Sequence, residues 1–356
     1  MAKQSIGIKV PKAKGEKTIV QANKLQIINR ELEIQRDTDS IYVPLICQPS
    51  TDELKALRKQ VRNCEISTYV FTERRQRKTS FVDLLEDKLP PRLLASLPHS
   101  ADIVGDIAII EVPPELEVHA NVIGEAFLKA NKNVRTVLAK AGAVSGTYRL
   151  RQFRTVAGED KTETIHKEHG CQYHVDVAKA YFSPRLSYEH NRVASFVKEG
   201  ETVVDLFAGV GPFVVLIAKK HENIKVYAVD VNPDAVKLLK KNLGFNRVDN
   251  KVYPILGDAR QVVKEKLSGI ANRVIMNLPE KAIEFVDAAC EALKPVGGII
   301  HFYGFINASG SIENVQRCFA EAAEKSGRRV ERIISSKKVR ATAPHEWQIV
   351  VDAIIR

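Results

Sequence analysis

The sequence predicts an α/β protein whose C-terminal half is built around a mostly parallel β-sheet. Short apolar strands alternate with helical segments from residue 202 onward, and this alternation is typical of parallel sheets. A glycine-rich turn joins the first of these strands to the first helix. The last two strands follow each other with no helix between them, which predicts an antiparallel hairpin at one edge of the sheet.

The elements of this C-terminal region, residues 181–356, follow from hydrophobic periodicity and turn residues. Strands are expected at residues 202–207, 225–230, 252–256, 273–277, 298–303, 330–336 and 348–355. Helices are expected at residues 212–220, 234–242, 282–293 and 312–325. We therefore treat residues 181–356 as one domain.

The first 180 residues predict two smaller domains. In residues 1–75 we expect strands at 5–10 and 40–46 and helices at 19–34 and 51–62. In residues 76–180, a small α+β domain, we expect helices at 83–89 and 116–130 and strands at 103–112, 134–140 and 147–156. A basic, polar segment at residues 73–79 is expected to link the two.

Composition and charge narrow the class of protein. The 356 residues are 44% hydrophobic and 27% charged, the balance of a soluble globular protein. No apolar run is long enough to cross a bilayer, and the first residues lack the apolar core of a secretory signal. The five cysteines are scattered and odd in number, which favours a reducing compartment such as the cytoplasm. The net charge of +11 favours a polyanionic partner.

The strongest local signal is the glycine-rich turn after the strand that begins the sheet. Gly209 and Gly211 permit a tight turn and a close approach to a ligand. In a dinucleotide site a third small residue would follow, and Val214 stands there instead. Asp205 would repel a pyrophosphate but suits the ammonium and sulfonium of S-adenosylmethionine. The turn therefore favours S-adenosylmethionine, the alternative being that its glycines only shape the backbone.

Two further carboxylates stand at the ends of the next strands. Asp230 can accept hydrogen bonds from both ribose hydroxyls, and Asp258 can accept one from the adenine amino group. Because ligands of open α/β sheets bind at the carboxyl ends of the strands, these side chains are expected around one site. The cofactor-binding residues predicted from these strand ends are Asp205, Phe207, Gly209, Gly211, Asp230, Val231, Asp258 and Asn277.

Catalytic candidates flank this site in the sequence. Asn277 ends the fourth strand and can both donate to and accept from a nucleobase edge. Arg185 and Glu189 would lie four residues apart on one helical face, either as an ordinary ion pair or with Arg185 positioning Glu189 as a general base. Such a base could take the proton from N1 of guanine, and an arginine could stabilise the charge that develops on O6.

Several stretches of the chain resemble the archaeal and eukaryotic type of tRNA (guanine-N1)-methyltransferase for position 37. They include Gly146-Thr-Tyr-Arg149, Tyr181-Phe-Ser-Pro-Arg185, the stretch from Asp205 to Phe213, and Asn277-Leu-Pro279. The glycine loop is common to many methyltransferases, whereas Y-F-S-P-R-L with its following glutamate and N-L-P are far more specific to this family.

The resemblance implies a class I methyltransferase fold, a Rossmann-like sheet with a terminal antiparallel hairpin, and a role for each matching residue. Glu189 matches the general base, and Arg149 matches the residue that stabilises guanine O6. Arg185 and Asn277 match residues that organise the target nucleotide, and Tyr181 matches a residue beside the cofactor. The resemblance also implies that residues 1–75 form a mobile domain that reads the outer corner of tRNA. The target base would be flipped out of the anticodon loop.

The sequence thus predicts transfer of a methyl group from S-adenosylmethionine to N1 of guanosine 37 of tRNA, by a monomer without a structural metal. Within the same fold, the alternatives are an aminocarboxypropyltransferase of the wybutosine pathway and a bifunctional enzyme that also methylates a guanine derivative. From other classes, a non-catalytic tRNA-binding protein and a dehydrogenase are alternatives.

Two other stretches are given structural roles. The histidine-rich segment between His166 and His174 lacks the spacing of a metal site. The loop from Arg340 to Trp347 is expected mainly to pack the last hairpin, although it could border the active site.

Overall fold

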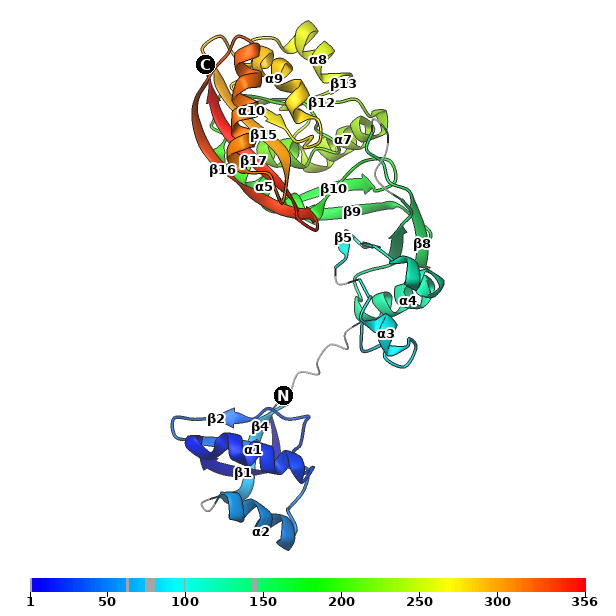
Figure 1. The fold of residues 1–356 in the computed structure, drawn as a ribbon, viewed down its shortest axis with the longest axis vertical. Coiled ribbons are helices and arrows are strands. Elements are labelled where there is room, and N and C mark those ends of the chain that lie inside the picture. The colour runs from blue at the N-terminus through cyan, green and yellow to red at the C-terminus, as the bar shows by residue number, and fades with distance from the viewer. Residues whose placement is uncertain (1, 62–63, 74–80, 99, 143–145, 147) are drawn as a thin grey trace. The chain divides into compact units, whose positions relative to one another are not determined.

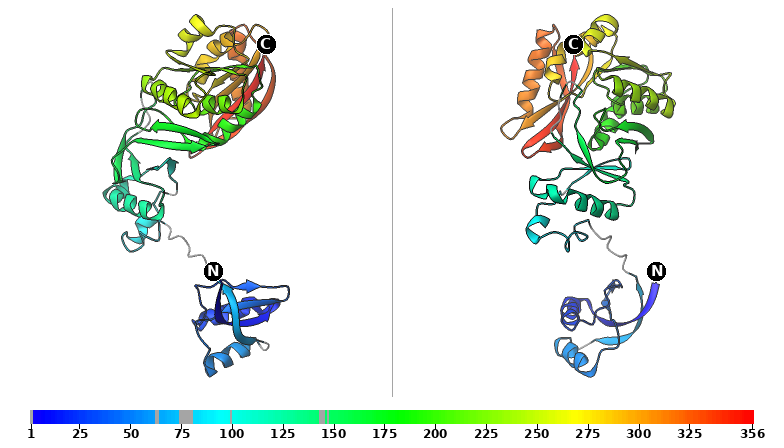
Figure 2. Two further views of the ribbon diagram at one scale, coloured as in Figure 1. Left: turned by 180° about the vertical axis from the view of Figure 1, so that it is seen from behind. Right: turned by 90° about the vertical axis from the view of Figure 1, so that its right-hand side faces the viewer.

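The computed structural model describes residues 2–61, 64–73, 81–98, 100–142, 146 and 148–356. The chain divides into two compact units, Met1–Ser80 and Phe81–Arg356, shown in Figures 1 and 2. The predicted boundary between residues 75 and 76, and the basic linker beyond Glu73, lie outside the described residues.

The first unit is a four-stranded antiparallel sheet of order β2-β3-β1-β4 with two helices. Its strands are β1 (Ala2–Pro11), β2 (Gln35–Arg36), β3 (Ser40–Pro44) and β4 (Glu65–Thr72), and its helices are α1 (Gly15–Lys24) and α2 (Thr51–Gln60). A capping box of Ser50 and Glu53 starts α2. Buried aliphatic side chains, including Ile8, Val43 and Leu57, join sheet and helices in one core.

Two expectations for this unit need correction. The helix predicted at residues 19–34 begins earlier and ends at Lys24, since Gln26 adopts a φ of 57° that no α-helix contains. The apolar residues beyond it are used differently: Ile28 forms a bridge with Leu45. Strand β4 was not predicted, although it pairs with β1 over eight residues.

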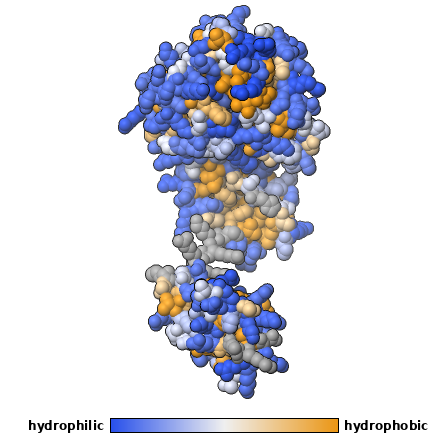
Figure 3. Space-filling model, turned by 90° about the vertical axis from the view of Figure 1, so that its left-hand side faces the viewer, coloured by the Kyte–Doolittle hydropathy of each residue, from blue (hydrophilic) through white to orange (hydrophobic). Residues whose placement is uncertain are grey.

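The second unit begins with a four-stranded sheet of order β5-β6-β7-β8. Its elements are α3 (Pro91–Leu94), β5 (Asp102–Val104), β6 (Ile107–Ile110), η2 (Pro114–His119), α4 (Ala120–Ala130), β7 (Thr136–Lys140) and β8 (Phe153–Gly158). Strands β6 and β7 are parallel, and α4 connects them. Figure 3 shows apolar side chains gathered over this part of the unit on the face that it presents.

Three expectations for this sheet were wrong in detail. Residues 83–89 form turns instead of a helix. The single strand predicted at 103–112 is a hairpin, because Gly105, with a φ of 58°, turns the chain between β5 and β6. The strand predicted at 147–156 starts only at Phe153, because Arg149 has a φ of 56°; Thr147 lies outside the described residues.

A hairpin that was not predicted follows this sheet. Strands β9 (Glu163–Glu168) and β10 (Cys171–Asp176) pair without a register shift. The two residues between them, His169 and Gly170, both have positive φ angles, 48° and 77°. Two consecutive positive φ angles are typical of a type I′ turn, which matches the twist of the flanking strands.

The seven-stranded sheet confirms the predicted fold class. Its order is β13-β12-β11-β14-β15-β17-β16. The first five strands are parallel, and β17 pairs antiparallel with both β15 and β16. The strands are β11 (Thr202–Asp205), β12 (Lys225–Asp230), β13 (Val252–Leu256), β14 (Arg273–Met276), β15 (Gly298–Asn307), β16 (Val330–Ala343) and β17 (Glu346–Ile355). The order reverses between β11 and β14, the place where open sheets bind ligands.

Helices cover both faces of this sheet (Figures 1 and 2). Helices α5 (Ser187–Phe196), α6 (Pro212–Lys220) and α7 (Pro233–Asn246) pack with alternate strand residues such as Val203. The other face, which carries Val204, packs against α8 (Ala259–Val262), α9 (Val286–Ala292) and α10 (Ile312–Lys325). Short helical turns η1 (Lys12–Lys14), η3 (Pro184–Leu186), η4 (Val263–Leu267) and η5 (Ala282–Phe285) complete the chain. No helix in the described residues is both long and apolar enough to span a membrane.

Candidate active site

A cavity of about 250 Å³ opens at the carboxyl ends of β11, β12 and β14. The predicted site residues that line it are Arg149, Tyr181, Phe207, Gly209, Asp230, Val231, Asp258 and Asn277. Asp205, Gly211, Arg185 and Glu189 are not among the lining residues. The predicted site therefore divides into a group that faces the cavity and a group that lies behind its wall or outside it.

The glycine turn owes its shape to two left-handed residues, Gly209 with a φ of 55° and Gly211 with a φ of 92°. A Cβ atom on Gly211 would lie 2.4 Å from Cδ1 of Leu239, so a larger residue would have to displace this leucine and would also strain the backbone. The Gly209 amide donates to Oδ2 of Asp230 at 2.7 Å, which ties the turn to the end of the neighbouring strand.

The two carboxylates expected to face an adenosine keep part of their accepting capacity. Asp230 accepts from the backbone amides of Gly209 and Asn232, and burial raises its pKa. Asp258 caps α8 through Oδ1 alone, which accepts from the amides of Arg260 and Gln261. Because an ionised carboxylate has about four acceptor positions, both can still bind hydroxyl or amino groups in the cavity.

Asp205 is the most perturbed acid of the site. Its side chain is 1% exposed, Oδ1 accepts from the Phe207 amide at 3.1 Å, and Oδ2 has no partner among the described residues. Burial raises its pKa to about 7. A buried carboxylate oxygen without a partner is costly, and a cationic ligand would offset that cost. This feature fits S-adenosylmethionine better than a pyrophosphate.

The number of protons released when S-adenosylmethionine binds should depend on the protonation of Asp205. Because the cationic cofactor favours ionised Asp205, it lowers a pKa that is about 7 in the free protein. Affinity for S-adenosylmethionine should thus rise as the pH increases toward 7 and level off above it. Calorimetry in buffers of different ionisation enthalpy should show fewer protons released by Asp205→Asn than by wild type. Asp234→Asn, at an exposed acid of α7, is the control; equal release by all three proteins would contradict this assignment.

Asn277 lies at the end of β14 and is linked to the last hairpin of the sheet. Gln348 donates to Oδ1 of Asn277 at 3.1 Å, and Arg340 donates to Gln348 at 2.9 Å. Both partners line the cavity. Arg340 lies in the loop that could border the site according to the sequence, whereas Gln348 was not among the predicted residues. The loop from Arg340 to Trp347 thus has two roles, because Trp347 packs against the sheet core while Arg340 faces the cavity.

Arg149 reaches the cavity from the turn before β8. Its Nη2 lies 3.0 Å from Glu280, and its guanidinium carbon lies 5.4 Å from the centre of the Tyr181 ring. Its Nε is buried and has no partner among the described residues. Arg149 nevertheless lines the cavity, and its positive charge suits a negative charge that develops there.

The predicted pairing of Arg185 with Glu189 was wrong. Arg185 lies in η3, before α5 begins, so the two are not on one helical face; its Nε is 2.5 Å from Asp102. Glu189 is 1% exposed and contacts Arg192 at 2.7 Å and Lys337 at 3.0 Å. Burial acts to raise the pKa of Glu189, but these two cations hold it below its ordinary value.

Glu189 belongs to a buried chain of charges beneath the cavity. The hydroxyl of Tyr303 donates to Glu189 at 3.1 Å, and Arg192 also contacts Asp352 at 2.5 Å. Asp352 in turn contacts His301, which contacts Arg273. Each buried charge has a partner, which is the condition for keeping a carboxylate ionised inside a protein. Two residues close to Glu189 in the chain, Leu186 at the end of η3 and His190 on α5, line the cavity.

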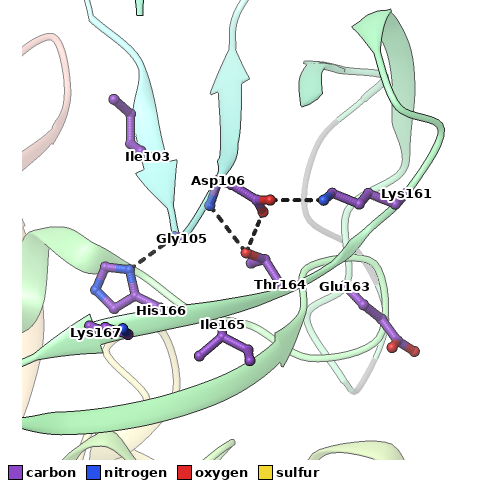
Figure 4. A pocket seen from close by; sticks show the side chains of 9 residues that line it. All are labelled: Ile103, Gly105, Asp106, Lys161, Glu163, Thr164, Ile165, His166 and Lys167. Atoms are coloured by element: carbon purple, nitrogen blue, oxygen red, sulfur yellow. Dashed lines mark hydrogen bonds and ion pairs between the residues drawn. The ribbon is translucent and has the colours of Figure 1, made fainter. Parts of the chain in front are cut away.

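A second cavity, of about 600 Å³, lies where the β5–β6 turn meets β9 (Figure 4). Its polar groups satisfy one another: Nδ1 of His166 accepts from the Gly105 amide, and Asp106 contacts Lys161 and Thr164. These contacts hold the β5–β6 turn to β9. Elsewhere in the histidine-rich segment, the His174 ring packs against Phe245 of α7.

Comparison with known protein families finds matches to three parts of the chain. The TRM5/TYW2 methyltransferase domain matches residues 164–331, the TYW2 N-terminal domain residues 81–162, and the tRNA methyltransferase 5 N-terminal domain residues 7–53. The tRNA (guanine(37)-N(1))-methyltransferase Trm5b of Pyrococcus abyssi is 37% identical over 348 residues, or 98% of each chain. The crystal structure of Trm5b from Pyrococcus abyssi is similar with a TM-score of 0.74 and 36% identity, and 99% of each chain is covered. The structure of aTrm5 in complex with tRNALeu is similar with a TM-score of 0.72 and 31% identity, and covers 99% of this chain and 100% of that one.

An aminocarboxypropyltransferase is also similar, over less of the chain. The tRNA(Phe) (4-demethylwyosine(37)-C(7)) aminocarboxypropyltransferase of Methanocaldococcus jannaschii is 34% identical over 250 residues, which are 70% of this chain and 95% of its own.

Proposed function

The chain belongs to the TRM5/TYW2 methyltransferase family, and from this membership we infer that it transfers a methyl group from S-adenosylmethionine to N1 of guanosine 37 of tRNA. The observation that carries this function is similarity to a named enzyme of that activity over 98% of both chains. The cavity between the glycine turn, Asp230 and Asn277 is where cofactor and target base would meet.

The aminocarboxypropyltransferase relative is the nearest rival. It matches 70% of this chain, whereas the guanosine-37 methyltransferase relative matches 98%. Residues 7–53 also match the tRNA methyltransferase 5 N-terminal domain. Mass spectrometry of tRNA after reaction with S-adenosylmethionine separates the two, because a single methyl is far lighter than an aminocarboxypropyl group. A methyl adduct supports the proposed function, and the heavier adduct would assign the chain to the rival activity.

For the reaction itself we propose a direct transfer. When bound in the cavity, S-adenosylmethionine would supply an electrophilic methyl on its sulfonium, so that the sulfur–methyl bond would break as the bond to N1 forms and S-adenosylhomocysteine would be the leaving group. Glu189 takes the N1 proton after its carboxylate turns from Lys337 toward the cavity. Lys337 is the partner with freedom to move, since its side chain is 35% exposed against 10% for Arg192. Arg149 donates to O6 as charge develops there.

The other predicted residues keep supporting roles in this proposal. Tyr181, Phe207, Val231 and the glycine turn would surround the cofactor, with Asp205 behind the turn as the partner of its positive charge. Arg185 is 42% exposed and would organise the nucleotides around the target base. We further propose that the enzyme works in the cytoplasm and is a monomer. Light scattering would test the oligomeric state.

Residues 1–75 are proposed to read the body of tRNA away from the anticodon. This part of the chain has its own core around Ile8 and Leu57, separate from the cores of the second unit. Its deletion should therefore weaken binding of full-length tRNA more than binding of an isolated anticodon stem-loop. Filter-binding titrations at one fixed salt concentration would measure both affinities. Equal losses for the two RNAs would contradict this role.

A further inference from the structure

The amide of Asn277 is held by an uninterrupted series of hydrogen bonds along the cavity wall. Gln348, which is 1% exposed, donates from Nε2 to Oδ1 of Asn277 at 3.1 Å. Arg340 donates from Nε to Oε1 of Gln348 at 2.9 Å. The same guanidinium donates to Oγ of Ser183 at 2.8 Å and to the hydroxyl of Tyr181 at 2.9 Å.

The direction of these hydrogen bonds is fixed by the guanidinium. Arginine has donors only, so Gln348 must turn its carbonyl oxygen toward Arg340. The amide nitrogen of Gln348 then faces Asn277, where only an oxygen can accept from it. The remaining amide group of Asn277, Nδ2, has no partner among the described residues, and Asn277 lines the cavity. An asparagine that could either donate or accept is thereby committed to donating.

We propose that Arg340 and Gln348 are positioning residues that hold Asn277 as a hydrogen-bond donor to O6 of the target guanine. The inference rests on the proposed function, in which O6 becomes negative as N1 loses its proton. Arg149 lines the same cavity, and its guanidinium carries several N–H donors. Asn277 and Arg149 together would supply two donors to one oxygen, the arrangement that stabilises an oxyanion.

The same arrangement would select the base. Guanine carries an acceptor, O6, at the position where adenine carries an amino donor. A fixed donor in the site therefore favours guanine, and an adenine would leave two donors facing each other without acceptors. Arg340 and Gln348 contribute to this selection although neither is assigned a contact with the base.

Replacing Gln348 by glutamate reverses the direction of its hydrogen bond with Asn277. The carboxylate accepts from Arg340 and can only accept from Asn277, so Asn277 must turn its oxygen into the cavity. We expect Gln348→Glu to slow single-turnover methylation by about 10²-fold, the effect of losing one oxyanion donor, with cofactor affinity unchanged. Gln348→Met, which removes both hydrogen bonds without inverting them, should lose less. Gln316→Glu makes the same chemical change on α10, where the glutamine donates to Ser336, and should keep the wild-type rate.

A double-mutant cycle with Asn277→Ala shows whether Gln348 acts through Asn277. In the Asn277→Ala background Gln348→Glu should cost no further rate, and all variants should unfold at similar temperatures. An equal loss from Gln348→Glu in both backgrounds, or a greater loss from Gln348→Met, would overturn the proposal. If the wild type transfers another group, or transfers to another nucleotide, the proposed function is wrong. The same double-mutant cycle, measured on that product, would still test whether Gln348 acts through Asn277.

Discussion

Replacing Glu189 by glutamine is expected to slow the methyl-transfer step by about 10²- to 10⁴-fold, the range for losing a general acid or base. Glutamine keeps the shape of the side chain and can still accept from Arg192, but it cannot take the N1 proton. Binding of S-adenosylmethionine should stay near normal, because Glu189 is not among the residues that line the cavity. Single-turnover kinetics with saturating tRNA would measure the chemical step, and calorimetry would measure cofactor affinity.

The control for this variant is Asp352→Asn. Asp352 is the other carboxylate that contacts Arg192, and it is as well buried as Glu189. Its replacement disturbs the same buried charges but leaves the proposed base in place. If both variants lose the same rate at the same folded fraction, the loss comes from the disturbed charges and Glu189 is not the base. A loss confined to Glu189→Gln supports proton removal by its carboxylate.

Replacing Arg149 by methionine is expected to slow the same step by about 10²- to 10³-fold, the cost of one oxyanion donor. Methionine fills much of the same volume but has no donor for O6, and the contact of Arg149 with Glu280 is lost as well. The effect should appear in the single-turnover rate at saturating tRNA, since the charge on O6 develops only during the reaction.

Arg151→Met is the matched control for this second variant. It removes the same charge two residues further along the chain, at a partly buried arginine that is not among the lining residues. It should change the concentration of tRNA needed for saturation more than the rate at saturation. A loss of rate at saturation as large as that of Arg149→Met would show that net charge, and not a donor to O6, is what the reaction needs.

The seven-stranded sheet could be predicted closely because the sequence signals for its strands and helices are local and repeated. Helices α6 and α10 and strands β12 and β13 have the predicted bounds. Each combines hydrophobic periodicity with a start or stop signal, such as Pro212 at the first position of α6 or the Ser311 cap of α10. The topology then followed from the alternation of strands and helices and from the two final strands.

The failures occurred where a local pattern is compatible with two structures. Residues 25–34 contain apolar residues at helical spacing but form an irregular segment after α1. Ile27 and Leu32 are buried although they are not in a helix. The hairpin of β5 and β6 has a turn signal in the sequence, since Gly105-Asp106 interrupts an otherwise continuous apolar run. His169-Gly170 carried a comparable turn signal between β9 and β10.

The site was predictable in its residue types and less so in its contacts. Motifs located Arg149, Tyr181, Asp230 and Asn277, which all line one cavity. The partners of these residues come from segments far away in the sequence and belong to no motif. Lys337 pairs with Glu189 across nearly 150 residues, and Arg340 reaches Tyr181 only because the last hairpin lies beside the cavity. Such pairs depend on the tertiary fold, so single-sequence patterns do not contain them.

Analysis of the nucleoside formed from an unmodified tRNA transcript tests the central claim most directly. The transcript is incubated with the protein and S-adenosylmethionine, digested, and its modified nucleoside identified and mapped, with a transcript carrying adenosine at position 37 as the control. We predict 1-methylguanosine at position 37 and no transfer to the control transcript. An aminocarboxypropyl adduct, a methyl group elsewhere in the tRNA, or no transfer at all would contradict the account.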